Sequence, residues 1–129
     1  MEIALRTALI DWLSADPALA GELNSITEEA PAKGALPWLA IATSASIDWS
    51  AKDRAGREVR IALELHCRGD RPDTAATLIA ALESRIAAIP AEQAGYRIVF
   101  AQFLRARTQQ RPANLRSILT EYRFRLLAD

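Results

Sequence analysis

The residues best suited to chemistry lie together in one segment of alternating apolar and charged residues, 59–68. His66 and Cys67 are neighbours there, and an imidazole beside a thiol is the pair that activates a cysteine nucleophile. The alternation predicts a β-strand, however, and consecutive side chains of a strand point to opposite faces of its sheet. We therefore expect Cys67 to be a buried core residue that His66 does not reach.

The same alternation places Arg60, Glu64 and His66 in a row on the accessible face of that strand. A carboxylate beside a histidine can act as a general base, which is the argument for a small enzyme. No motif marks a nucleophile to accompany them, so a row of ion pairs on a wet face, or one covered by a neighbouring subunit, is favoured. We expect no catalytic residues and assign these three to a subunit or partner interface.

The supply of ligands argues against a metal or cofactor site. The chain has one histidine and one cysteine, whereas a structural zinc site takes four ligands mainly from these residue types. Glu28 and Glu29 are adjacent acids without further oxygen ligands nearby, which is typical of solvated carboxylates. The five glycines are scattered and form no phosphate-binding loop. We expect neither a metal nor a cofactor.

Four arginines and no acid lie in the stretch 104–116, at Arg105, Arg107, Arg111 and Arg116. Arginines on a projecting hairpin can contact phosphates, but the interleaved aromatic residues of single-strand binders are missing. For these four arginines, contact with another protein is favoured over exposure to solvent at the tip of a hairpin or binding to DNA. Trp38 and Trp49 flank one predicted strand, and each fits either a contact surface or the core.

The net charge of zero hides a strong asymmetry along the chain. Residues 1–95 hold nine basic and fourteen acidic side chains, whereas residues 96–129 hold seven arginines against Glu121 and Asp129. Such a division can give complementary surfaces for head-to-tail association or for contact with a polyanion. Pairing of these charges within the fold is the equally weighted alternative.

Hydrophobic periodicity predicts a single α+β domain over residues 1–129. We expect helices at 2–14 and 72–89, a short helix after Asp16-Pro17, a short edge strand at 25–30, and strands at 38–49, 59–68, 96–107 and 115–127. Polar turns between successive strands predict an antiparallel sheet of four to five strands, with the two main helices packed on one face. No segment resembles a signal peptide or a membrane span, so we expect a soluble protein made in the cytoplasm.

Several short motifs follow one another in a recognisable order: Glu28-Glu29-Ala30-Pro31, Leu36-Pro37-Trp38, Asp48-Trp49-Ser50 with Lys52, and Gly56-Arg57-Glu58-Val59. Together with the opening helix and the closing strand 122–127, this order resembles the tail-completion proteins of long-tailed phages. The same family occurs in prophages and gene transfer agents of alphaproteobacteria. The resemblance covers essentially the whole chain, and the arginines of 105–116 are its main departure from the family.

The resemblance implies a ring, expected to contain six subunits, that closes the head-proximal end of a tail tube. The implied partners are further copies of the chain, the tail tube protein and the head–tail connector or stopper protein, with no membrane. DNA would pass through the lumen without sequence-specific binding. The family contributes no catalytic or cofactor residues. The alternatives are a head-completion stopper or minor tail component of the same particle, a small DNA-binding protein, and an enzyme.

Overall fold

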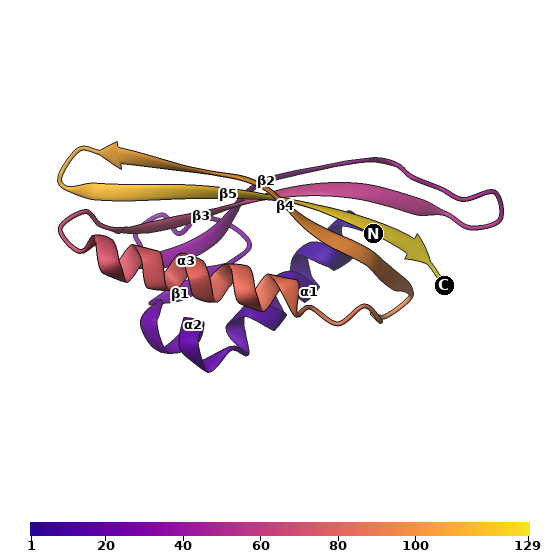
Figure 1. The fold of residues 1–129 in the computed structure, drawn as a ribbon, viewed down its shortest axis with the longest axis horizontal. Coiled ribbons are helices and arrows are strands. Elements are labelled where there is room, and N and C mark those ends of the chain that lie inside the picture. The colour runs from indigo at the N-terminus through magenta and orange to yellow at the C-terminus, as the bar shows by residue number, and fades with distance from the viewer.

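A computed structural model describes all residues, 1–129, as one sheet with helices on a single face (Figure 1). The helices are α1 (Glu2–Ser14), α2 (Pro17–Glu22) and α3 (Pro72–Ala87). In α1 the buried residues Leu5, Leu9 and Leu13 recur every four positions, so one stripe of the helix faces the sheet. The predicted α+β class and the two main helices on one face are confirmed.

The sheet has five strands in the order β1-β2-β3-β5-β4. They are β1 (Ser25–Thr27), β2 (Trp38–Asp48), β3 (Gly56–Arg68), β4 (Tyr96–Arg111) and β5 (Leu115–Ala128). All neighbouring pairs are antiparallel except β1 with β2, which is parallel because residues 28–37 carry the chain back before β2 begins. The sheet is therefore mixed at one edge, where the sequence predicted only antiparallel pairing.

Alternation along β3 divides its side chains between the two faces of the sheet. Val59, Ile61, Leu63, Leu65 and Cys67 are all buried against the helices. Phe124 and Leu126 of β5 lie on the same inner face and are fully buried. Cys67 is thus a core residue, as the alternation predicts, and burial raises the pKa of its thiol.

Contacts between Trp12 of α1 and Arg85 of α3 link the two main helices. Trp12 Nε1 donates to the carbonyl oxygen of Arg85 at 2.7 Å, and Arg85 Nε donates to the carbonyl oxygen of Trp12 at 2.9 Å. The guanidinium carbon also lies 3.4 Å from the centroid of the indole ring, within cation–π range. These contacts fix how α1 and α3 lie across the sheet. None of the helices is long and apolar enough to span a membrane.

The β4–β5 hairpin extends further than the sequence indicates. β4 continues to Arg111, whose Cα partner is Leu115, so the turn contains only residues 112–114. Ala113 and Asn114 take up the positive φ angles that so short a connection requires. The polar run at 108–110 concealed the strand because this part of β4 is an exposed edge, where apolar alternation is not needed.

Candidate assembly surface

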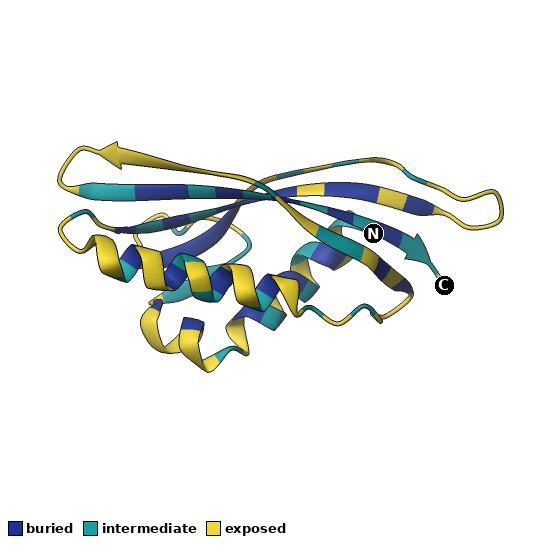
Figure 2. Cartoon of the chain, in the orientation of Figure 1, coloured by how far each residue is buried: buried dark blue, intermediate teal, exposed yellow.

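The outer face is the side of the sheet that the helices leave uncovered. Strand registers assign to it alternate residues of the four long strands, and these include arginines from three of them: Arg60, Arg97, Arg105, Arg107, Arg111, Arg123 and Arg125. The glutamates on the same face are Glu58, Glu64 and Glu121. Figure 2 shows how the far end of β4 in particular is exposed along its length. The outer face is therefore predominantly basic.

Glu58 is the centre of a charged cluster on this face, near the start of β3. Its side chain is only 8% exposed, and its Oε1 accepts a hydrogen bond from Arg125 Nε at 3.0 Å. Arg60 and Arg123 each place Nε 3.9 Å from a carboxylate oxygen of Glu58. One nearly buried carboxylate is thus shared by three arginines, which compensates its desolvation and holds their stems against the sheet.

Arg125 also lies between two aromatic rings. Its guanidinium carbon is 5.2 Å from the centroid of the Trp49 ring and 4.9 Å from that of Phe100, so both rings lie within cation–π range. Trp49 follows β2 and is half-buried, so part of it remains available on the surface. Its contact with Arg125 ties the end of β2 to β5.

Arg105 and Glu121 form a two-pronged ion pair across β4 and β5. Nε and Nη2 of Arg105 donate to the two carboxylate oxygens at 2.9 and 3.1 Å. These hydrogen bonds hold the pKa of Glu121 below its ordinary value and raise the pKa of Arg105. Arg105 is therefore already paired with a carboxylate of its own chain.

Arg107 and Arg111 follow Arg105 along the outer face of β4, and neither forms an ion pair within the chain. Arg116, the fourth arginine of the predicted group, pairs in register with Cys67 and so lies toward the inner face. Its Nη2 donates to the carbonyl oxygen of Gly69 at 3.2 Å. The four arginines are thus divided between both faces, and only Arg107 and Arg111 remain free on the outer one.

The predicted row Arg60, Glu64 and His66 shares one face but not one environment. His66 stacks on Trp38 with ring centroids 4.1 Å apart, and its Nε2 lies 3.4 Å from Glu64 Oε2. A Cβ added at Gly34 would lie 2.9 Å from Cδ1 of Trp38, so the loop 31–37 packs closely on this ring. Arg60, by contrast, is largely exposed and contacts the Glu58 cluster instead.

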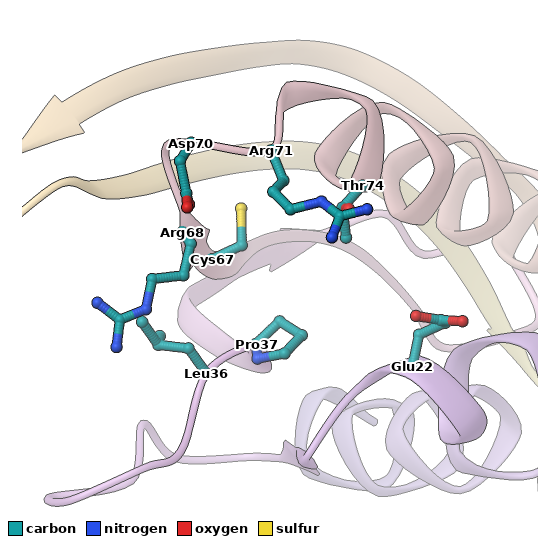
Figure 3. Close-up of a pocket in the computed structure, with 8 residues that line it drawn as sticks. All are labelled: Glu22, Leu36, Pro37, Cys67, Arg68, Asp70, Arg71 and Thr74. Carbon is teal, nitrogen blue, oxygen red and sulfur yellow. The ribbon is translucent and has the colours of Figure 1, made fainter.

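A pocket with a volume of about 410 Å³ lies elsewhere, at the start of α3 (Figure 3). It is lined by Arg71, which directly precedes that helix, Thr74 of the helix, Cys67 of β3 and Glu22 of α2. Its charged side chains are of both signs, and no group of three or more His, Cys, Asp or Glu side chains in the protein is placed to hold a metal ion. The pocket thus presents no convergent set of catalytic groups.

Sequence reasoning did not identify the charged cluster that Glu58, Arg123 and Arg125 form on the outer face. The available signal was the alternation of Arg123 and Arg125 with the buried residues Tyr122, Phe124 and Leu126. That alternation shows that both arginines face outward. It does not show that Glu58 lies opposite them, because this depends on the register between β3 and β5.

A basic sheet face and a long unpaired strand edge are features that surfaces for contact with other macromolecules often have. The sequence model for Tail completion protein gp17 matches residues 7–127, and the chain belongs to this family. It is accordingly a structural protein of phage-type tails. No curated protein matches the chain. Among solved structures, a chain titled "Virion of native gene transfer agent (GTA) particle" has the same fold, with a TM-score of 0.80, 24% identity, and coverage of 97% of this chain and 96% of that one.

Proposed function

We propose that the protein is a ring-forming tail terminator, placed at the head-proximal end of a long phage-type tail. In this role it joins the tail tube to the head connector, and DNA passes through the lumen of the ring. Membership of the tail completion family over nearly the whole chain is the observation that carries the proposal. The fold shared with a chain of a gene transfer agent virion supports a place in a phage or gene transfer agent particle.

The geometry supports an assembly role in place of catalysis. Arginines on the outer face are held by Glu58 and Glu121, and His66, which lies beside Glu64, is stacked on Trp38. The uncompensated Arg107 and Arg111 stand on an exposed sheet edge, where a partner protein can reach both their charges and the strand backbone. These features suit repeated contact between copies of the chain and with neighbouring tail and head proteins.

The test is growth of the tail tube in the presence of this protein. Purified tube protein from the same particle is allowed to polymerise, and tube length is followed by electron microscopy after the protein is added. A terminator stops elongation at one subunit ring per tube end, at amounts far below those of tube protein. Unchanged elongation, together with binding to the head connector alone, would instead assign the protein to the head-completion stopper class.

A further inference from the structure

The far end of β4 is an unpaired strand edge. Residues 106–111 lie beyond the second of two β-bulges, pair regularly with β5 on one side and have no strand on the other. All six are exposed, and Arg107 and Arg111 have no ion-pair partner. A regular, exposed edge of this length is open to pairing with another strand.

A second free edge of the same length lies on the opposite side of the sheet. β1 covers only residues 38–40 of β2, so residues 43–48 pair with β3 on one side and with no strand on the other. The side chain of Ser44 in this stretch is hydrogen-bonded to Glu2 and Arg6 of α1 on the inner face. This half of β2 also begins just after a bulge and pairs regularly from there. Ile47 is 63% exposed in it, an unusual exposure for a large apolar side chain.

The two edges are compatible in direction and position. Three successive antiparallel pairings separate β2 from β4, so the two strands run in opposite directions. The hairpins that carry the two free stretches project at opposite ends of the molecule (Figure 1). A second copy in the same orientation, displaced along the strands, therefore brings one stretch beside the other as an antiparallel pair.

We propose that residues 106–111 of β4 in one copy pair with residues 43–48 of β2 in the next, so that the sheet continues from subunit to subunit. This inference rests on the proposed function and names the contact from which the ring is built. Full overlap that keeps the two outer faces together sets Arg111 opposite Thr43, Gln109 opposite Ala45, and Arg107 opposite Ile47.

The outer face beside β2 has room for these side chains. A depression of about 140 Å³ is lined by Thr43, Ala45 and Ala62, with Arg60 and Glu121 at its margin. In this register the long side chains of Gln109 and Arg111 lie over the small residues. Ile47 offers apolar surface to the stem of Arg107. The contact thus buries the most exposed apolar residue of the strands.

The contact is heterologous, because it joins two different edges, so each copy can bind a further one. The chain of copies forms a ring where the rotation between neighbours brings the last copy back to the first. Six paired residues fall short of the roughly 1,200 Å² that a stable isolated interface buries. A single contact is therefore weak, and assembly depends on ring closure or on a tail end that gathers the subunits. The protein is expected to be monomeric at low concentration and to form rings on the tail tube.

Disulfide trapping tests this pairing. Ala45→Cys and Gln109→Cys are combined in a Cys67→Ala background and oxidised mildly together with tail tubes. The matched control combines Ala45→Cys with Gln102→Cys, which lies on the same strand and face but between the two bulges. We expect a ladder of disulfide-linked multimers from the first pair, at least ten times stronger than from the control. Folding of each variant is checked by circular dichroism.

Rings formed by the wild-type chain, with no ladder from the trapping pair, would overturn the pairing and leave the terminator function standing. Ladders of equal strength from the trapping pair and from the control pair would also overturn the pairing, because they would show that the cysteines meet by non-specific collision. Absence of wild-type rings on tubes would overturn the proposed function itself. If a variant does not fold, hydrogen exchange on the wild-type chain replaces the trapping experiment. We expect the backbone amides of 43–48 and 106–111 to gain protection on assembly. Unchanged exchange of these amides would contradict the proposal.

Discussion

Arg125 donates from Nε to Oε1 of Glu58 at 3.0 Å, on a sheet face that no helix covers. A carboxylate that is 8% exposed would be costly on its own, and Arg60 and Arg123 approach it as well. The shared carboxylate keeps the three arginine side chains ordered on an exposed surface. It makes the outer face a fixed arrangement of charges instead of a set of mobile side chains.

Glu58→Gln is expected to destabilise the fold. The substitution leaves three arginines without their shared carboxylate, and we expect the free energy of unfolding to fall by about 1–3 kcal/mol, since the arginines themselves stay partly solvated. Urea unfolding followed by circular dichroism measures the change. Glu92→Gln is the matched control: Glu92 pairs with Arg97 in an exposed site, and its loss is expected to cost less than about 1 kcal/mol. Equal effects would contradict the anchoring role of Glu58.

Glu121 gives the fold a specific dependence on acid. Hydrogen bonds from Arg105 lower the pKa of this carboxyl from its ordinary value of 4.5, so the unfolded chain binds the proton more readily than the folded one. The contribution of the pair is therefore fully present above pH 4.5 and is lost as the pH falls through the folded pKa. In thermal melts, Glu121→Gln should lose less stability than the wild type over that acidic range. Parallel pH profiles of the two proteins would refute this.

Arg107 and Arg111 are expected to serve assembly and not folding. Replacing both with glutamate should change the free energy of unfolding by less than about 0.5 kcal/mol, because neither has a partner within the chain. Capping of tail tubes should nevertheless be abolished or greatly weakened. The reference variant is Arg116→Ala, since this residue contacts the carbonyl oxygen of Gly69 and lies toward the helices. Loss of capping by Arg116→Ala alone would contradict the assignment.

The same double variant separates protein contact from DNA contact. If these arginines bound DNA phosphates, the wild-type chain would bind duplex DNA with an affinity that falls steeply with salt. We expect no such binding at low salt by the isolated chain. Salt-dependent binding that Arg107→Glu and Arg111→Glu remove would favour the DNA alternative.

Cys67 is expected to be unreactive in the native protein. Its side chain is buried in the core, and burial raises the pKa of its thiol, so little thiolate is present at neutral pH. Reaction with a soluble thiol reagent should be slow in buffer and become fast in denaturant. Rapid native labelling would show that β3 opens, or that Cys67 does not lie on the inner face.

Much of the fold was predictable because it depends on local patterns. The alternation of 59–68 placed Cys67 inside and Arg60 outside, and helical spacing placed Leu5 and Leu9 on the buried stripe of α1. The parallel direction of β1 was not predictable, since a three-residue strand carries no information on which way its partner runs. Packing between distant segments decided that direction.

The assembly surface was predictable only in part, because it depends on register between strands. Arg111 and Arg116 read alike in the sequence, but the short turn between them leaves the first on the outer face and the second on the inner. Similarly, nothing near Glu58 in the sequence identifies Arg125 as its partner, 67 residues away. Charge asymmetry along the chain did indicate that the C-terminal hairpin is basic, and the structure places every arginine of that hairpin except Arg116 on the outer face.

The most direct test of the central claim is electron microscopy of tail tubes assembled with the protein bearing a visible label. We expect one ring of labelled subunits at a single end of each tube, with no further tube protein added beyond it. Labelled protein scattered along the tubes, or left in solution as monomers while the tubes continue to lengthen, would contradict it.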